Sequence, residues 1–294
     1  MDALFPTFKT FYVNGQLLDL SGSFNFALCM GILNATPDSF FEGSRVNSVD
    51  AAIQQAEKMV SDGVRILDIG GHSTRPGAEP VTEQEEVNRV IPIIETLNKL
   101  FPNLIISIDT YRLNVAKAAF SAGAHIFNDI GGGQMDKGIF DWICSNQIPY
   151  VLTHSVGQFE MVHQIPNYNH VVEDVWTDLA KKVQLLRSKG LKNLMIDPGF
   201  GFSKSLDQNY QLLAHLNQFT LLGAPILVGL SRKTMIHKFL QIDADQSLNG
   251  STALQAIALT KGAQILRVHD VKEAMEVIKL VHKLNQYGVS DICE

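Results

Sequence analysis

Cysteine is scarce in this sequence, and the few cysteines are not paired by their spacing. The 294 residues contain three, Cys29, Cys144 and Cys293. A sparse, odd set without a C-x-x-C pair does not make a disulfide framework and does not suit a structural zinc site. Such cysteine usage is typical of a reducing compartment, so we expect a cytoplasmic protein.

Basic charge and long apolar runs are also in short supply. Lysine and arginine number 24 against 30 acidic residues, a net charge of −6, which excludes a chain-wide basic surface for nucleic acid. The longer apolar runs, such as residues 26–33, fall far short of the about 18 residues that cross a bilayer. The start of the chain also lacks the apolar segment of a signal peptide. We therefore expect neither a nucleic-acid nor a membrane partner, and a bound anion would need a local site.

The sequence has the proportions of hydrophobic and charged residues that are typical of a globular protein. Hydrophobic residues make up 46% and charged residues 18%, so a packed core is expected and extended disorder is not. No linker rich in proline, glycine or serine divides the chain, and its composition does not shift along its length. We therefore expect a single domain over residues 1–294.

The apolar pattern predicts a short hairpin followed by strands and helices in alternation. An Asn-Gly pair at 14–15, between two short apolar runs, predicts a β-hairpin over about residues 11–20. Later apolar runs occupy residues 27–33, 64–67, 104–108, 125–127, 150–153, 194–196, 225–230 and 265–268. Stretches of helical periodicity follow at 49–62, 83–100, 113–122, 138–146, 169–189, 205–217, 251–261 and 271–286.

Eight such repeats predict an α/β protein with parallel strands and right-handed crossovers. We interpret them as a (β/α)8 TIM barrel with an N-terminal β-hairpin. An open doubly wound sheet is the alternative, although such sheets commonly have fewer strands.

Polar side chains stand where the predicted strands end, which is the end of a parallel barrel that carries its active site. They are Asn34, Asp68, Asp109, Asn128, His154, Asp197, Ser231, Arg232, Lys233, Arg267 and His269. One aspartate in such a place can simply cap the next helix, but capping does not explain so many. We expect a polar cavity for a ligand with many hydrogen-bonding groups and at least one anion.

Two kinds of ligand group are indicated. Lys233, Arg267 and His269 follow the last two strands, and arginine binds phosphate oxygens as a fork. For Arg232, pairing with a carboxylate on a helix is an equally good interpretation. The acids and amides elsewhere suit a flat, nitrogen-rich ring, because a carboxylate accepts from two N–H groups and an amide offers a donor and an acceptor.

Seven motifs now stand in series along the chain. They are MGILNATPDSF (30–40), DIGGHSTRPGA (68–78), SIDTYR (107–112), FNDI (127–130), DPGFGF (197–202), VGLSRK (228–233) and RVHDV (267–271). Each is weak alone, but the series is specific. From about residue 26 to residue 283, the chain resembles the dihydropteroate synthase family of pterin-binding enzymes.

The resemblance implies a barrel that is usually a homodimer and a transferase reaction of folate biosynthesis. In that reaction 6-hydroxymethyl-7,8-dihydropterin diphosphate condenses with 4-aminobenzoate, giving 7,8-dihydropteroate and diphosphate, with Mg²⁺ as cofactor. Sulfonamides compete for the aminobenzoate site in this family.

The resemblance also implies roles for individual residues. The pterin is held by Asp109, Asn128, Asp197 and Lys233. The diphosphate is held by Asn34, Arg267 and His269, and Asn34 is also the magnesium ligand. The aminobenzoate pocket is shaped by Thr74, Arg75, Pro76, Phe202 and Ser231. The implied catalytic residues are Asp109, Lys233 and Arg75, with Asp109 stabilising a cationic pterin, while loops 35–48 and 71–82 close over the reacting groups.

The chain departs from the family pattern at four positions. His72 stands where the family commonly has Glu, Phe41 replaces a polar residue of the first loop, and Thr153 and Ser155 replace the methionines beside His154. We expect these changes to affect loop packing and one wall of the pocket. Two alternatives are a pterin-dependent methyltransferase, which would lack STRPGA and SRK, and a non-catalytic pterin-binding paralogue.

Overall fold

An antiparallel hairpin opens the described part of the chain, as the Asn-Gly pair predicts. The computed structural model describes residues 10–19, 27–35, 45–72, 81–157 and 165–287. Strands β1 (Thr10–Val13) and β2 (Gln16–Asp19) pair with Val13 opposite Gln16. Asn14 and Gly15 have φ of 49° and 67°, as a two-residue hairpin turn of type I′ requires.

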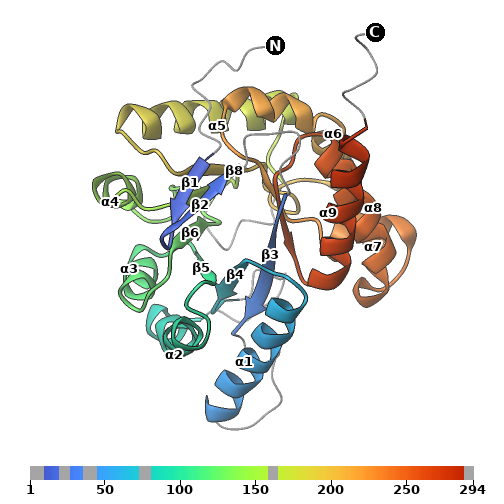
Figure 1. The fold of residues 1–294 in the computed structure, drawn as a ribbon. Helices are drawn as coiled ribbons and strands as arrows, with labels where there is room; N and C mark the ends of the chain where they lie inside the picture. The colour runs from blue at the N-terminus through green and yellow to red at the C-terminus, as the bar shows by residue number, and fades with distance from the viewer. Residues whose placement is uncertain (1–9, 20–26, 36–44, 73–80, 158–164, 288–294) are drawn as a thin grey trace.

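Eight parallel strands form the central sheet (Figure 1). They are β3 (Leu28–Asn34), β4 (Ile66–Gly70), β5 (Ile105–Thr110), β6 (Ile126–Asp129), β7 (Tyr150–Thr153), β8 (Leu194–Asp197), β9 (Leu227–Val228) and β10 (Ile265–Val268). Their order is β8-β7-β6-β5-β4-β3-β10-β9. A parallel bridge between Ile196 and Ile226 joins the two edges, so the sheet is a nearly closed barrel and the predicted fold class is confirmed.

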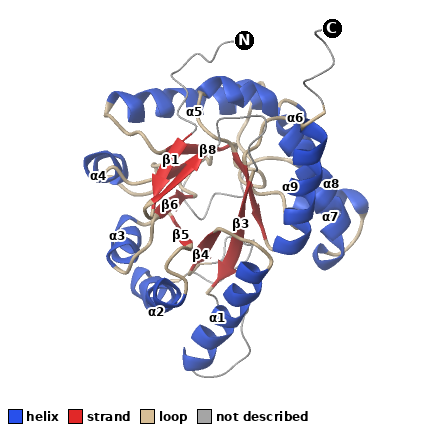
Figure 2. Ribbon diagram, viewed as in Figure 1, coloured by secondary structure: helices blue, strands red, loops and turns tan. Residues whose placement is uncertain are grey.

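Helices surround the barrel (Figure 2). They are α1 (Arg45–Ser61), α2 (Glu83–Leu100), α3 (Leu113–Ser121), α4 (Ile139–Asn146), α5 (Val171–Ser188), α6 (Leu206–Ala214), α7 (Thr234–Leu240), α8 (Leu248–Thr260) and α9 (Val271–Asn285). Most lie within a few residues of their predicted bounds. The stretch 205–217 instead divides into α6 and a 3₁₀ helix, Leu216–Leu222. Helix α7 was not predicted, because seven residues are too few to display a helical period.

Capping explains where two of the helices begin. The Thr82 hydroxyl accepts a hydrogen bond from the backbone N of Glu85 at 3.2 Å, and the Glu85 carboxylate accepts one from the backbone N of Thr82 at 2.8 Å. Ser205 and Gln208 repeat this arrangement before α6. Each pair satisfies backbone donors that a helix N-terminus would otherwise leave free.

The interior of the barrel starts with an apolar layer at the amino ends of the strands. Its inward-facing members are Leu28, Met30, Ile66, Ile105, Ile126, Val151, Met195, Leu227 and Ile265, joined by Val13 and Leu18 of the hairpin. The Asn14 side chain donates hydrogen bonds to the carbonyls of Pro102 and Leu104 at 3.0 and 3.2 Å. The hairpin thus closes this end, and the carboxyl ends of the strands are left for a ligand.

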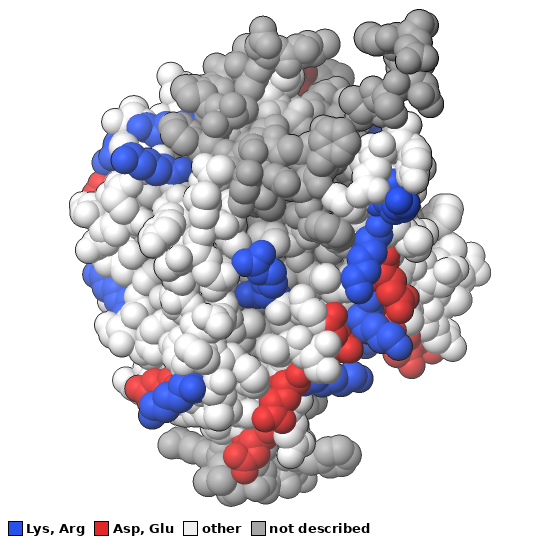
Figure 3. Space-filling view, in the orientation of Figure 1, with Lys and Arg blue, Asp and Glu red and all other residues white. Residues whose placement is uncertain are grey.

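The outer face carries mixed charge. On the face shown in Figure 3, basic and acidic side chains are interspersed, and α9 carries both, among them Lys272, Glu276 and Lys279. None of the described helices is both long and apolar enough to cross a membrane.

Candidate active site

Polar side chains form the next layer of the barrel interior, two residues beyond the apolar layer on six strands. They are Asp68, Ser107, Asn128, Thr153, Asp197 and Arg267. The parallel register sets Asp68 beside Ser107 and Thr153 beside Asp197. Further toward the mouth, Asp109 lies opposite Gly70, which in turn lies opposite Asn34. The structure therefore gathers the predicted strand-end residues at one mouth of one barrel.

Arg267 joins the two buried carboxylates of β4 and β5. Its Nε donates to Oδ2 of Asp68 at 2.5 Å, and its Nη2 donates to Oδ2 of Asp109. Burial raises the pKa of Asp109 to about 7, against the attraction of Arg267 and with the help of the neighbouring Asp68 charge. Asp109 is thus harder to ionise than an exposed aspartate.

Asn128 is held in one orientation by Asp68. Its Nδ2 donates to Oδ2 of Asp68 at 2.9 Å, and both side chains are buried. Since the amide nitrogen is bound to a carboxylate, the amide oxygen is the group that Asn128 can offer to a ligand. Asp68 therefore fixes which end of this amide faces the cavity.

Asp197, Lys233 and Phe202 form the opposite side of the mouth. Oδ1 of Asp197 accepts from the backbone N of Gly199 at 2.8 Å, although burial still raises the pKa of this carboxyl. Burial, and then the charge of Arg267, lowers the pKa of Lys233 to about 8. The Lys233 ammonium lies 4.7 Å from the centre of the Phe202 ring, a distance at which the ring face attracts a cation.

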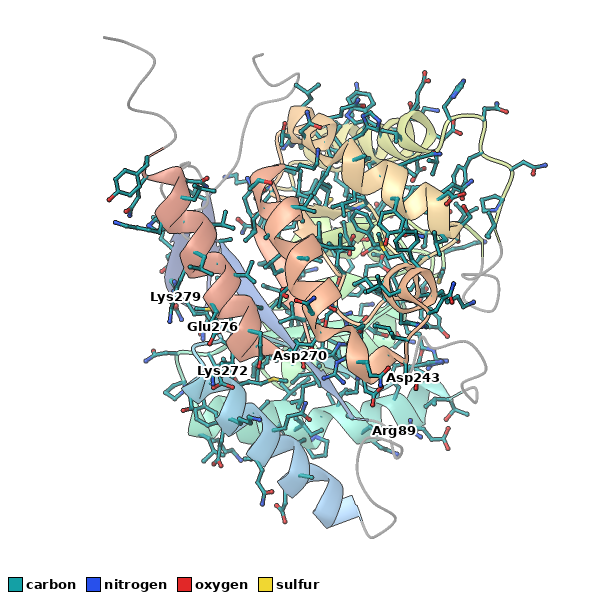
Figure 4. The ribbon with its side chains drawn as sticks, turned by 90° about the vertical axis from the view of Figure 1, so that its right-hand side faces the viewer. Arg89, Asp243, Asp270, Lys272, Glu276 and Lys279 are labelled. Atoms are coloured by element: carbon teal, nitrogen blue, oxygen red, sulfur yellow. The ribbon has the colours of Figure 1, made fainter. Side chains whose placement is uncertain are left out.

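The loops after β9 and β10 are fastened to each other. Ser231 Oγ lies 3.2 Å from Nδ1 of His269, and burial followed by the Arg267 charge lowers the pKa of His269 to about 4. His269 is therefore a neutral hydrogen-bonding group at pH 7 and does not add to the positive charge. Arg232 donates two hydrogen bonds of 3.1 and 2.6 Å to Asp270, so the interpretation that it pairs with a carboxylate is confirmed. Asp270 lies at the start of α9, where Figure 4 labels it.

Several buried polar atoms of this interior have no hydrogen-bond partner. They are Asp68 Oδ1, Ser107 Oγ, Asp109 Oδ1 and Thr153 Oγ1. Buried polar atoms in proteins are normally satisfied, so a group of orphans calls for an explanation. All four belong to inward-facing positions of the same mouth, which indicates a ligand that supplies the missing partners.

Asn34 offers an amide oxygen at the mouth, but the described residues around it do not form a complete metal cage. Oδ1 of Asn34 would lie 3.7 Å from a Cβ placed on Gly70, so it borders the space above that glycine. Within the described ranges, no group of three or more His, Cys, Asp or Glu side chains is arranged to hold a metal. Mg²⁺ usually keeps several waters and binds through one or two protein oxygens together with substrate phosphates. The donor set fits an ion of that kind.

Some predicted site residues lie outside the described residues: Thr74, Arg75, Pro76 and Phe41. Most of the two predicted loops, 35–48 and 71–82, lies there as well. His72 is described, with its ring 6.2 Å from that of Tyr111. Thr153 and Ser155 are both buried.

Sequence reasoning gave no individual role to three buried charged residues near the carboxyl ends of the strands, although Asp68 was among the residues expected in the cavity. Asp68 is one of them. Asp129 accepts hydrogen bonds from the backbone N of Gly131 and Gly133, each at 2.7 Å, and from the Tyr150 hydroxyl at 2.5 Å. Lys204 lies buried behind the loop after β8. The strand-end position of Asp68 was a usable signal, but a lysine is so seldom buried that its type argues against an interior place.

Comparison with known proteins agrees with this geometry. Residues 30–269 match the family described as Pterin binding enzyme. Dihydropteroate synthase of Haemophilus influenzae is 42% identical over 271 residues, covering 92% of this chain and 96% of the relative. Two structures of the Xanthomonas albilineans dihydropteroate synthase are similar. The one with 4-aminobenzoic acid has a TM-score of 0.85 and 37% identity, covering 95% of this chain and 98% of that one. The one with 7,8-dihydropteroate has a TM-score of 0.83 and 35% identity, covering 94% and 98%. The chain therefore belongs to the pterin-binding enzymes and, within them, to the dihydropteroate synthases.

Proposed function

We propose that this chain joins 6-hydroxymethyl-7,8-dihydropterin diphosphate to 4-aminobenzoate at the mouth of the barrel, releasing diphosphate and forming 7,8-dihydropteroate. As a dihydropteroate synthase, the chain is a transferase of the folate pathway. The observation that carries the placement is the set of orphaned polar atoms on Asp68, Ser107, Asp109 and Thr153. A pterin presents N–H and C=O groups along its edges, so it can supply the partners that these atoms lack.

The pterin is proposed to lie among Asp109, Asn128, Asp197 and Lys233. Two carboxylates accept from the N–H groups of its guanidine-like edge, and the amide oxygen of Asn128 accepts from another. The Lys233 ammonium donates to a ring acceptor. Asp68 offers its unpartnered Oδ1 to the ligand, while its Oδ2 holds Asn128 in its orientation.

The chemistry follows from the charges of this pocket. When the bond between the pterin methylene carbon and the diphosphate oxygen breaks, its electron pair leaves with the diphosphate and positive charge grows on the pterin. An ionised Asp109 stabilises that charge because a carboxylate in a buried site acts through a low dielectric. The neutral amine of 4-aminobenzoate then forms the new C–N bond and loses a proton. An enzyme nucleophile is not required by this route.

The diphosphate is proposed to lie beside Asn34, Arg267 and His269. Arg267 is already paired with two carboxylates, so it offers phosphate only its remaining N–H groups. The neutral His269 contributes a hydrogen bond. Asn34 would hold Mg²⁺ brought in with the diphosphate, and the ion would supply neutralisation of the departing phosphate charge.

The aminobenzoate pocket is proposed to be bounded by Phe202 and Ser231, together with Thr74, Arg75 and Pro76 of the second loop. Arg75 would pair with the carboxylate of 4-aminobenzoate. Closure of loops 35–48 and 71–82 would keep water away from the cationic pterin, because hydrolysis would compete.

Assembly and location are part of the proposal. Exposed apolar side chains gather on α7, α8 and α9, among them Phe239, Ile257, Leu280 and Leu284, and we infer that this face forms a homodimer contact. The two described cysteines, Cys29 and Cys144, are free thiols, which supports the cytoplasm as the working compartment.

The proposed reaction is tested by diphosphate release. Purified protein with the pterin diphosphate and Mg²⁺ should release diphosphate only when 4-aminobenzoate is added, and 7,8-dihydropteroate should accumulate in equal amount. Binding of the pterin without any release would identify a non-catalytic paralogue and contradict the proposal.

A further inference from the structure

Lys204 is a buried lysine to which the reaction above gives no task. It is 8% exposed and stands between the loop after β8 and helix α6. Three acceptors lie 3.0 Å from its Nζ: the carbonyl oxygens of Gly199 and Phe202 and the Nδ1 of His154. An ammonium group has three N–H donors, so the protonated side chain is saturated by these three partners.

This arrangement sets the state of His154. A protonated Lys204 can only donate, so in that state Nδ1 accepts and the ring is neutral with its proton on Nε2. Burial, followed by the charge of Lys204, lowers the pKa of His154 well below its ordinary value, which agrees with a neutral ring. His154 thus acts as a fixed acceptor at the end of β7.

The loop that Lys204 fastens is tightly wound. Gly199, Gly201 and Ser203 have positive φ of 75°, 81° and 51°. A Cβ on Gly199 would lie 2.0 Å from the carbonyl oxygen of His154, so the loop presses directly on the end of β7. Glycine adopts positive φ without strain, whereas Ser203 needs support from its surroundings to hold it. Lys204 binds two carbonyls of this loop, those of Gly199 and Phe202.

The same loop carries two groups of the site. The backbone N of Gly199 binds Asp197, and the Phe202 ring packs under the Lys233 ammonium. A Cβ on Gly201 would lie 3.1 Å from Cδ of Lys233, so the loop backbone also supports the stem of that lysine. Movement of the peptide from Gly199 to Phe202 would displace the wall beside Lys233.

We propose that Lys204 is a positioning residue of the transferase, tying the loop after β8 to His154 and so holding Phe202 as a fixed wall of the aminobenzoate pocket. Lys204 acts through that loop and does not touch either substrate. The inference rests on the proposed place of 4-aminobenzoate beside Phe202.

Protonation of Lys204 matters for this role. Burial lowers its pKa to about 7; Asp197 and Asp178 oppose that shift and Lys233 adds to it, while His154 at the end of β7 and Lys182 on α5 also face this region. Loss of the proton removes one of the three donors. The loop that carries Phe202 should therefore become less firmly held as the pH rises through about 7.

The test compares Lys204→Met with a matched control, Lys182→Met. Methionine keeps the apolar stem and removes every donor. Lys182 is buried to a similar degree and is bound at 2.8 Å to Asp178 of the same helix. We expect Lys204→Met to raise the KM for 4-aminobenzoate about tenfold while kcat falls less than about threefold, a split that general destabilisation does not produce. Lys182→Met should lower Tm and leave that KM within about twofold of wild type.

A pH series provides a second readout. In the wild type the KM for 4-aminobenzoate should rise from about pH 6 to about pH 8, one unit on either side of the Lys204 pKa. Lys204→Met should lack this rise, although Asp109 and Lys233, which titrate in the same range, are present in both proteins. A constant KM over that range, or equal KM changes in Lys204→Met and Lys182→Met, would overturn the inference.

A third variant, Phe202→Leu, distinguishes failure of the Lys204 inference from failure of the proposed function. If Phe202→Leu raises this KM and Lys204→Met does not, only the role of Lys204 is wrong; if Phe202→Leu also leaves the KM unchanged, the proposed pocket is wrong.

Discussion

The buried carboxyl of Asp109 can stabilise positive charge during the reaction, but burying it lowers the stability of the folded chain. Asp109 is buried next to Asp68, and Arg267 is shared between them. The folded chain raises the pKa of Asp109 from an ordinary value of 3.8 to about 7. Burial makes this carboxyl difficult to ionise even beside Arg267, and a cationic pterin would add a second attraction, so the site favours the charged state of the reaction over the resting state.

Asp109→Asn should cut turnover much more than pterin affinity. The amide keeps the size and a hydrogen-bonding oxygen but cannot stabilise positive charge, so we expect kcat to fall about a hundredfold or more. Calorimetric affinity for a pterin without diphosphate should change by less than about tenfold. Asp50→Asn, on the exposed face of α1, serves as the control. Equal losses of turnover and of affinity would mean that Asp109 acts in substrate binding alone.

The same group predicts a pH dependence of stability. Between about pH 4 and pH 7 the folded chain holds a proton on Asp109 that the unfolded chain has lost, because burial raises the folded pKa above 3.8. The contribution of this bound proton to the free energy of unfolding is complete at low pH and is lost as the pH rises through about 7. Urea unfolding of wild type and Asp109→Asn over this range should show a stability difference that shifts in favour of the variant as the pH rises. A difference independent of pH would contradict the raised pKa.

Arg267→Ala should lower the stability of the fold as well as the affinity for the diphosphate substrate. Its removal leaves Asp68 and Asp109 buried together without the bound guanidinium, and loss of one partner from a buried ion pair costs about 3–5 kcal/mol. We therefore expect a lower free energy of unfolding, and weaker binding of the diphosphate substrate and of a pterin without diphosphate. Arg65→Ala, exposed near the hairpin, is the matched control. A variant as stable as wild type, with only the diphosphate substrate affected, would show that the ion pairs do not contribute.

The hairpin is the element that closes the far end of the barrel. Leu18 is buried with the inner strand residues, whereas its neighbour Leu17 is 66% exposed. Leu18→Ala should lower the free energy of unfolding by about 2–5 kcal/mol, because a buried cavity is left in the apolar floor. Leu17→Ala should have an effect below about 0.5 kcal/mol. Denaturant unfolding measures both, and equal values would mean that the hairpin does not seal the barrel.

Most elements could be predicted because each has a period of its own. Strands β5 and β7 are short apolar runs that end at a polar residue, and α2 is an amphipathic stretch that begins after a capping threonine. Helix α7 is too short for a period. Position along the strands also predicted that Asp109, Asn128 and Asp197 would meet. Which charges pair could not be predicted, because Arg267 reaches Asp68 across 199 residues of sequence and only the folded barrel brings them together.

Three parts of the molecule have different roles: one end of the barrel is closed, the other end faces the ligands, and the outside carries an apolar face for assembly. The hairpin and the inner apolar layer close the amino end, and the polar layer at the carboxyl end faces the ligands. Helices α7, α8 and α9 lie together on one side of the barrel (Figure 1) and expose apolar side chains that a lone chain would normally bury. We expect assembly through this face to stabilise the fold without completing the site.

Two substitutions on α9 test that expectation. Leu280 and Leu284 are 71% and 63% exposed and stand one turn apart on the same helix face. In a dimer that buries this face, Leu280→Glu with Leu284→Glu would place two carboxylates in an apolar contact without partners, at a cost that exceeds the gain from association. Light scattering on a sizing column should then give the mass of one chain, while KM values for both substrates stay within about twofold of wild type. Leu185→Glu on α5, also exposed, should leave the dimer intact. A double variant that keeps the mass of two chains would remove α9 from the contact, and a large rise in KM would mean that the partner contributes to the site.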